Sequence, residues 1–338
     1  MRQKALSILL SLLIPTFVAT AQTPLLCRVS VENPASHFQA RAVRQFTVLL
    51  AERSKGVLRV EFYDTAKLYR DADAVSALAA GQVEIIVPGI WQLDRFVPET
   101  AALMLPSTYA QPQSVIRALV DGPFGESLSA SIGKVLGAVV LGPWLDVGYG
   151  QLFSSARPIR TIGELGGKRI RVAGGKANEE RIRALGGTAV SISMQDLPSY
   201  LERGLLDGIL STYETIDSAR LDGQGIKWVL EDNEYYPYYV PLAGAHFWTK
   251  LTPELKELVV RTWNEIVGPA REESIRAQLA AKKNLQSRGL VVYQPTEEEL
   301  KVTRRKLLDA ENAIALRLNI PAETIGLLRS EIARQNKK

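Results

Sequence analysis

The sequence has a single cysteine and only two histidines among 338 residues. One cysteine excludes a disulfide framework and any metal site built from several thiolates, such as a multi-cysteine zinc or iron–sulfur centre. The two histidines, His37 and His246, lie far apart in the sequence, so a two-histidine metal site would need distant parts of the chain to meet. Protein classes that rely on several histidines are therefore disfavoured.

A strong excess of either charge is also missing. The chain has 41 lysines and arginines against 36 acidic residues, and its formal net charge is +5. A nucleic-acid-binding protein usually shows a basic stripe with interleaved aromatic residues, and here the only basic cluster at an end is Arg334 to Lys338. We therefore expect no nucleic acid partner. Hydrophobic residues make up 46% and charged residues 23% of the chain, which excludes a disordered or fibrous protein.

Beyond the N-terminus, the sequence has no span of about 20 apolar residues. Arg2 and Lys4 precede an uncharged stretch from Ala5 to Val18, and Ala19-Thr20-Ala21 has the small-x-small pattern that signal peptidase recognises. The stretch is shorter than the roughly 20 apolar residues that span a bilayer, which disfavours the alternative of a membrane anchor. We predict a signal peptide of residues 1–21, cleaved after Ala21. Cys27 follows two leucines rather than a small residue, so we expect a buried free cysteine in a strand and no lipid attachment.

Short apolar strands alternate with amphipathic helices, which predicts an α/β protein. A helix end, a glycine and an acid-bearing strand follow one another twice, around Gly81 and around Gly204. This repeat indicates two similar lobes, although chance could also produce it. Towards the C-terminus the pattern predicts helices over about 252–267 and 270–287, separated at Gly268-Pro269, and then a strand over 290–293. Thr296–Glu299 has the capping-box pattern and predicts the start of a helix over about 296–318, which a helical tail follows, and Thr161–Glu164 has the same pattern before a short helix.

Motifs for catalysis or for cofactor binding are absent: the sequence has no HExxH, CxxC, EF-hand, Walker A or GxSxG pattern. Gly174-Gly175 joins a predicted strand to a helix, and the N-terminus of such a helix can bind an anion through its free amides. A GxGxxG pattern does not fit there, and Glu179 and Glu180 would repel a phosphate. We therefore predict no cofactor and no metal.

Arg171 is the strongest candidate for ligand binding. It lies near the carboxyl end of the predicted strand 168–172, and open α/β sheets bind their ligands at that edge. A guanidinium group presents a planar pair of donors that matches a carboxylate. From the residues alone, a structural ion pair with a neighbouring acid is an equally good interpretation.

Short motifs decide between these two interpretations, because their order and spacing hold over most of the chain. The segments are Ala35–Phe38, Glu52–Gly56, Lys67-Leu68, Ala74–Gly81, Leu105-Pro106, Arg157–Ile159, Leu165–Val172, Ala184–Gly187, Gly204–Gly208 and Trp248–Leu255. With them the chain resembles the DctP-type solute-binding proteins of TRAP (tripartite ATP-independent periplasmic) transporters. Each segment alone is weak evidence for the family, but their shared order and spacing make the match fairly specific.

The resemblance implies a two-lobe periplasmic-binding-protein-like fold with a hinge and a long linking helix. Lobe I would comprise residues 22–147 and about 232–269, lobe II residues 148–231 and about 286–338, and the linking helix residues 270–287. Such proteins bind an organic acid in the periplasm and deliver it to membrane permease subunits. Arg171 falls on the family arginine that binds the carboxylate. We further expect a monomer or weak dimer, with no enzymatic activity.

The sequence departs from the family pattern at three polar positions, which are Gly150, Ser211 and Gly244 here. Aromatic residues lie near those positions or in lobe I. We predict a pocket for a monocarboxylate with an apolar or aromatic body, although these rings could equally be core residues. The candidate ligand-binding residues are Arg171, Ser211, Trp91, Trp144, Tyr149 and Tyr213.

Two other functions remain open at this point. An extracytoplasmic carboxylate sensor would have the same fold and would pass its signal to a membrane receptor. An exported hydrolase would need His37 or His246 as a general base, and no local pattern supports one.

Overall fold

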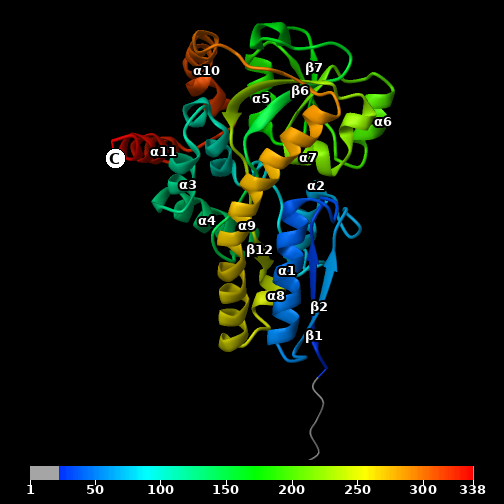
Figure 1. The fold of residues 1–338 in the computed structure, drawn as a ribbon. Helices are drawn as coiled ribbons and strands as arrows, with labels where there is room; N and C mark the ends of the chain where they lie inside the picture. The colour runs from blue at the N-terminus through cyan, green and yellow to red at the C-terminus, as the bar shows by residue number, and fades with distance from the viewer. Residues whose placement is uncertain (1–22, 338) are drawn as a thin grey trace, which may run out of the picture.

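The computed structural model describes residues 23–337, so the predicted signal peptide of residues 1–21 lies outside the described part of the chain. The chain folds into two α/β lobes, each built on its own sheet (Figure 1). We call the lobe with the five-stranded sheet lobe I and the lobe with the six-stranded sheet lobe II. The predicted α/β class with two lobes is confirmed, whereas the exact limits of the lobes remain a prediction.

The lobe I sheet has the strand order β2-β1-β3-β12-β4. β1 pairs in parallel with β2 and β3, and β12 runs antiparallel to β3 and β4. Cys27 and Val29 of β1 are fully buried, so the free cysteine is a core residue, as predicted. The strands are β1 (Leu25–Ser30), β2 (Leu58–Tyr63), β3 (Ile85–Ile86), β4 (Ala138–Val140) and β12 (Leu242–Gly244).

The lobe II sheet has the order β13-β10-β6-β9-β7-β8. β7 runs parallel to both neighbours, so its carboxyl end and that of β9 lie at the same edge. The helix–glycine–strand repeat noted in the sequence leads into β3 in one sheet and β9 in the other. The strands are β6 (Gly150–Ser154), β7 (Arg169–Val172), β8 (Thr188–Ser191), β9 (Gly208–Ser211), β10 (Trp228–Tyr235) and β13 (Val291–Tyr293).

A two-stranded antiparallel ribbon connects the lobes. β5 (Leu145–Asp146) lies between β4 and β6, and β11 (Tyr238–Tyr239) lies between β10 and β12. Asp146 is fully buried and fixes the ribbon to its surroundings. Its carboxylate accepts a hydrogen bond from the Tyr236 hydroxyl at 3.2 Å and pairs with Arg117 and Arg271. The crossing segments are therefore anchored by a shared charge network.

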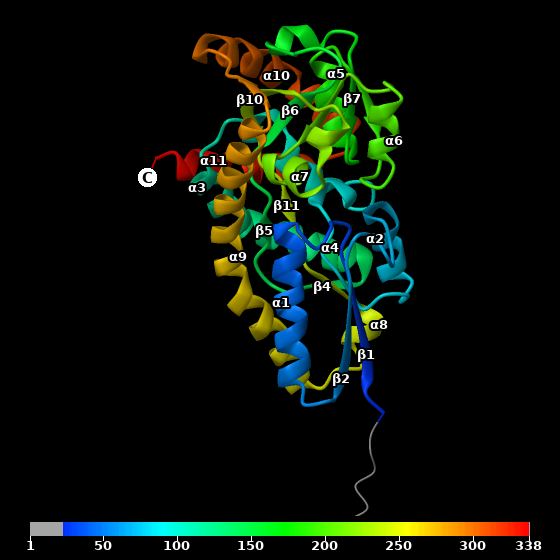
Figure 2. The same cartoon turned by 45° about the vertical axis from the view of Figure 1, so that its right-hand side comes forward.

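A third connection is the helix α9 (Pro253–Ser287), and here the prediction of two helices separated at Gly268-Pro269 is wrong. A proline inside a helix loses a backbone hydrogen bond and clashes with the preceding turn, at a cost of about 3 kcal/mol. Packing keeps the helix continuous, because Ile266 and Ala270 on either side are buried. α9 contacts α1 in lobe I and α7 in lobe II, as Figures 1 and 2 show. The linking helix therefore begins well before residue 270.

The remaining helices lie around the two sheets. Between strands of the lobe I sheet the chain forms α1 (Phe38–Arg53), α2 (Asp71–Ala79), α3 (Gln113–Val120) and α4 (Pro123–Leu136), and α8 (Ala245–Trp248) follows the last of these strands. Between strands of the lobe II sheet it forms α5 (Lys176–Ala184), α6 (Leu197–Glu202) and α7 (Tyr213–Ser218). The short 3₁₀ helices are η1 (Ile90–Gln92), η2 (Pro98–Met104), η3 (Pro106–Thr108), η4 (Ile162–Leu165) and η5 (Leu221–Gln224).

Two further helices end the chain, α10 (Glu297–Arg317) and α11 (Ala322–Gln335). The capping box predicted for α10 is present. The Thr296 side chain accepts a hydrogen bond from the Glu299 backbone amide, and the Glu299 side chain accepts one from the Thr296 backbone amide. α10 packs against α5 and η3, and α11 packs against α3 and α4. The C-terminal segment therefore contacts elements of both lobes. Among residues 23–337, no helix combines the length and the apolar character needed to cross a membrane.

Candidate ligand-binding site

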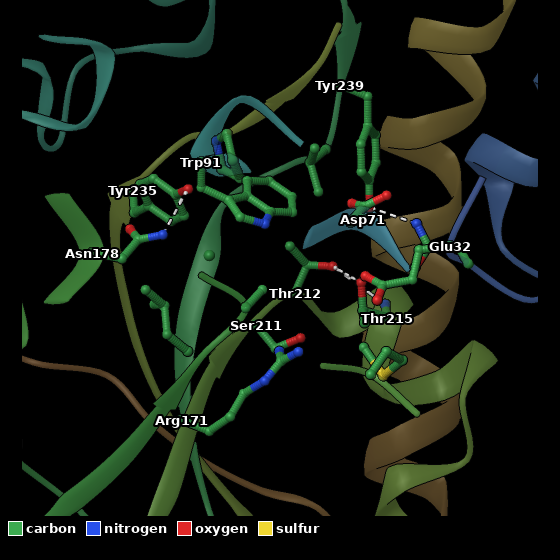
Figure 3. Close-up of a pocket in the computed structure, with 17 residues that line it drawn as sticks. Glu32, Asp71, Trp91, Arg171, Asn178, Ser211, Thr212, Thr215, Tyr235 and Tyr239 are labelled. Carbon is green, nitrogen blue, oxygen red and sulfur yellow. Dashed lines mark hydrogen bonds between the residues drawn. The ribbon is translucent and has the colours of Figure 1, made fainter. Parts of the chain in front are cut away.

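A cavity with about 50 Å³ of space for water-sized molecules lies where the two lobes meet. Figure 3 shows side chains from both lobes directed into it. Lobe I and the connecting segments contribute Glu32, Asn33, Asp71, Trp91, Val147, Pro237 and Tyr239, and lobe II contributes Gly150, Arg171, Ala173, Asn178, Met194, Leu210, Ser211, Thr212, Thr215 and Tyr235.

Arg171 extends from β7 into this cavity and is only 2% exposed. Its Nε donates to the Ile192 carbonyl oxygen at 2.8 Å, which fixes the plane of the guanidinium group. Burial lowers the pKa of Arg171 to about 10, with the nearby Glu32 and Tyr239 opposing this shift, so the group stays charged at neutral pH. No ion pair joins Arg171 to a protein carboxylate within residues 23–337. A buried cation in this state is complementary to an incoming anion.

Hydroxyl groups lie close to Arg171 on the lobe II wall. Ser211 ends β9, the strand next to β7, and lines the cavity. Thr212 caps α7 by accepting from the Thr215 amide at 3.3 Å, and both threonines also line the cavity. These hydroxyls can donate to a carboxylate or accept from a ligand hydroxyl.

Two aromatic rings in the cavity wall lie directly on glycines. A Cβ atom on Gly89 would be 2.2 Å from Cζ2 of Trp91, and one on Gly150 would be 2.7 Å from Cδ1 of Tyr235. Gly150 is one of the positions where the sequence departs from the family pattern, and the Tyr235 ring fills the adjacent space. The departure therefore coincides with an aromatic surface in the cavity.

The structure brings together three of the six predicted site residues, Arg171, Ser211 and Trp91, and their contact with a ligand stays a prediction. The other three do not line this cavity. Trp144 is 2% exposed with its ring 6.3 Å from that of Tyr238, and Tyr149 donates from its hydroxyl to the Gln111 carbonyl oxygen at 2.9 Å.

The third of these residues, Tyr213, turns away from the cavity into the lobe II core. Its ring lies edge-on to Phe153 at 5.4 Å, and its hydroxyl donates to Glu231 at 3.1 Å. All three aromatic side chains are therefore held by protein contacts.

Sequence reasoning missed several groups that line the cavity, above all Glu32, Asp71, Asn178 and the two tyrosines Tyr235 and Tyr239. One signal for Glu32 was available, because it follows the carboxyl end of β1, the edge where α/β sheets bind ligands. The tyrosines belong to a run at 235–239 that crosses from β10 to β11.

Contacts between the lobes border the cavity on the side of η1. The Gln92 amide donates from Nε2 to the Ala173 carbonyl oxygen at 2.9 Å, and the Ala177 amide donates to Asp94 Oδ2 at 3.2 Å. The free amides expected at the start of α5 therefore meet the carboxylate of Asp94 from lobe I. Burial raises the pKa of Asp94 to about 6, and the amides of Ala177 and Lys176 oppose this shift.

A matching contact lies near His37, where a lobe II carboxylate accepts from the start of a lobe I helix. The Phe38 amide at the start of α1 donates to Glu214 Oε1 at 3.0 Å, and Glu214 belongs to α7 of lobe II. His37 Nε2 lies 2.8 Å from the other oxygen of that carboxylate. Each lobe thus places a carboxylate at a helix N-terminus of the other lobe, where amides and the helix dipole favour negative charge.

Groups of three or more histidine, cysteine or acidic side chains that could hold a metal ion do not occur within the described range 23–337.

The comparisons with known proteins agree on one family. The family described as bacterial extracellular solute-binding protein, family 7 (DctP), matches residues 29–313. The C4-dicarboxylate-binding protein DctB of Bacillus subtilis (strain 168) is 26% identical over 275 residues, which is 79% of this chain and 75% of the relative.

Solved structures show the same fold. The sugar acid binding protein DctPAm from Advenella mimigardefordensis, in complex with galactonate, has a TM-score of 0.85 and 21% identity and covers 91% of this chain and 98% of its own. A TRAP periplasmic solute-binding protein from Sulfurospirillum deleyianum with bound succinate has a TM-score of 0.83 and 19% identity and covers 91% of this chain and 99% of its own. The resemblance seen in the sequence is confirmed, and the chain belongs to the DctP family, family 7 of the bacterial extracellular solute-binding proteins.

Proposed function

We propose that this protein binds a monocarboxylate with an apolar or aromatic body in the periplasm and delivers it to the membrane permease subunits of a TRAP transporter. Arg171 binds the carboxylate in this proposal, and Ser211 contributes a hydroxyl beside it. Trp91 and Tyr235 cover the body of the ligand, together with the apolar side chains of Val147 and Leu210.

The observation that carries the proposal is the state of Arg171. The guanidinium group is buried in the cavity between the lobes and stays charged, and one of its donors is fixed by a backbone carbonyl. An unpaired buried charge is costly, and a ligand carboxylate offsets this cost with a pair of charge-assisted hydrogen bonds. The names of the relatives agree with this chemistry, since each ligand that they mention is an organic acid.

Binding by closure of the two lobes follows from the distribution of the lining residues. Arg171 comes from lobe II and Trp91 from lobe I, so the complete site exists only when the lobes are in contact. A ligand that touches both walls stabilises the closed form by its differential affinity for that form. The ribbon of β5 and β11 and the helix α9 absorb the rotation.

The proposal includes export with cleavage after Ala21, a monomer or weak dimer, and no catalysis. The two histidines that a hydrolase would need lie apart in the fold. His37 is buried against Glu214 at the start of α1, and His246 is exposed on α8, with Nε2 2.8 Å from Nζ of Lys250.

A thermal-shift screen of the chain from Gln22 onwards against organic acids tests the function. A ligand at about 100 times its dissociation constant stabilises the folded state by about 2.7 kcal/mol. We expect monocarboxylates with apolar or aromatic bodies to give the largest shifts. Stabilisation by non-acidic solutes alone, or turnover of an ester or amide substrate, would contradict the proposal.

A further inference from the structure

Two carboxyl groups line the cavity from lobe I and take no part in the role given to Arg171. Glu32 follows β1 and is 9% exposed, and Asp71 begins α2 and is 4% exposed. The Asp71 carboxylate accepts from the Gly89 amide at 3.4 Å, and the amides of Asp71 and Met194 face Glu32. Neither carboxyl group forms an ion pair with another side chain within residues 23–337.

Two acidic side chains thus lie together on the lobe I wall of the cavity. Burial raises the pKa of both groups. The charge of Glu32 raises the pKa of Asp71 further, whereas the charges of Arg171 and Arg70 oppose the shift of Glu32. A third carboxylate beside them would add like-charge repulsion in a region of low dielectric. Such an arrangement rejects a partner that brings negative charge.

The balance of charge on the cavity wall points the same way. Arg171 is the only basic residue among the lining residues, and Glu32 and Asp71 are the only acidic ones. One guanidinium group satisfies one carboxylate through paired hydrogen bonds. A second carboxylate on the ligand would therefore lie against carboxyl groups rather than against a cation.

Two further polar atoms on the wall have no hydrogen-bond partner within the described chain. They are Nε1 of Trp91 and Oδ1 of Asn178, which belong to residues that are 9% and 3% exposed. Figure 3 shows both residues at the cavity, with the indole nitrogen of Trp91 turned into it. Buried polar atoms without partners are rare in native proteins, and a bound polar molecule would satisfy them. The cavity is therefore suited to a ligand with polar groups beyond its carboxylate.

We infer that the ligand carries a hydrogen-bond-donating group, a hydroxyl or an ammonium, at the end that faces lobe I, and that Glu32 and Asp71 accept from it and reject dicarboxylates. This inference rests on the proposed function and adds a second point of recognition. The ligand then lies with its carboxylate against lobe II and its donor group against lobe I. An ammonium group is paired by an ionised acid, whereas a hydroxyl needs only an acceptor oxygen.

Calorimetry with ligands of equal chain length tests the inference. One series is butyrate, 4-hydroxybutyrate, 4-aminobutyrate and succinate, and a longer one is hexanoate, 6-hydroxyhexanoate, 6-aminohexanoate and adipate. In at least one series we expect the hydroxyl or the ammonium compound to bind at least about tenfold more tightly than the dicarboxylate. Preference for the dicarboxylate, or no binding of any donor-bearing compound at about 10 mM, would overturn the inference.

The variant Glu32→Gln sharpens the test, because it removes the charge and keeps an acceptor oxygen. We expect the preference over the dicarboxylate to fall by about tenfold. If wild type favours the ammonium compound, Glu32→Gln should abolish its binding, and if wild type favours the hydroxyl compound, Glu32→Gln should retain its binding. Unchanged selectivity would contradict the assignment. Glu84→Gln is the matched control, since Glu84 is a buried lobe I acid paired with Arg28.

Arg171→Ala separates this inference from the proposed function. If dicarboxylates bind best and Arg171→Ala abolishes their binding, the carboxylate site stands and the inference fails. If donor-bearing acids bind equally well to wild type and to Arg171→Ala, the role of Arg171 fails while the acidic end remains assigned.

Discussion

The two walls of the cavity differ in charge although both are built at the carboxyl ends of strands. Lobe II presents the buried cation Arg171 with hydroxyl groups around it, and lobe I presents the acids Glu32 and Asp71. Each wall also packs one aromatic ring against a glycine, Tyr235 in lobe II and Trp91 in lobe I. The walls therefore each carry an aromatic ring, but only lobe II supplies a cation and only lobe I supplies acids, which gives a bound molecule a fixed direction between the lobes.

Removal of the lobe II cation is expected to have the largest effect. Arg171→Ala leaves the ligand carboxylate buried without a partner and should weaken binding by about 2–5 kcal/mol. Arg171→Lys should also weaken binding, because an ammonium group cannot form the planar pair of hydrogen bonds. Isothermal titration calorimetry with the best acid from the screen measures both.

Arg169→Ala provides the control for that comparison. Arg169 lies on the same strand, and it is partly exposed and paired with Asp207 at 3.1 Å. Its removal should leave the affinity unchanged. Equal affinity in the Arg171 and Arg169 variants would remove the distinction between the two walls.

The contact of Asp94 with α5 predicts a dependence of stability on pH. Burial raises the pKa of this carboxyl from 3.8 to about 6. Because the pKa is raised in the folded protein, its contribution to stability is present in full below the unfolded value and is lost as the pH rises through about 6. Compared with Asp94→Asn, the wild type should lose up to about 3 kcal/mol of unfolding free energy across this window.

Chemical denaturation of both proteins at a series of pH values measures this difference. A constant offset between wild type and Asp94→Asn at every pH would contradict the raised pKa of the buried Asp94 carboxyl.

The two glycines beneath the aromatic rings allow the walls to be compared directly. Gly89→Ala places a Cβ atom 2.2 Å from Trp91, and Gly150→Ala places one 2.7 Å from Tyr235. Both should lower stability, by about 1–3 kcal/mol, because rings in a packed wall cannot move freely. Thermal denaturation measures both losses of stability, and we expect the larger one for Gly89→Ala. A larger loss at Gly150 would show that the lobe I ring yields more easily.

The smallest effect is expected from the exposed ion pair that joins the lobes. Arg70 Nη1 lies 2.8 Å from Asp196 Oδ2, and both side chains are nearly half exposed. Such pairs contribute about 0–1 kcal/mol and are screened by salt. Arg70→Ala should therefore change ligand affinity by less than about fivefold at physiological salt. A loss as large as that of Arg171→Ala would mean that closure depends on the surface pair.

Strand and helix positions could be predicted where the pattern is local. The Thr296–Glu299 capping box forms as predicted, whereas the capping box predicted at Thr161 does not, since that side chain makes no cap contact. Pro269 misled the prediction because the burial of its neighbours, a tertiary effect, outweighs the local penalty. Long-range packing of this kind is invisible in one sequence.

The site itself could be predicted only in part. Arg171 and Ser211 lie near the carboxyl ends of β7 and β9. The cavity lies at this edge of the sheet, so their place in the strand also predicts that they line it. Tyr213 is two residues beyond Ser211, yet it starts a helix and points into the core. Glu32 and Asp71 meet only because β3 brings the two segments together, and no spacing in the sequence records that contact.

A crystal structure of the protein with its bound acid tests the central claim most directly. The account predicts a ligand carboxylate oxygen about 2.7–2.9 Å from the terminal nitrogens of Arg171, with the remote end of the ligand at Glu32 and Asp71. A guanidinium group turned out of the cavity and paired with a protein carboxylate, while the ligand is bound elsewhere, would contradict it.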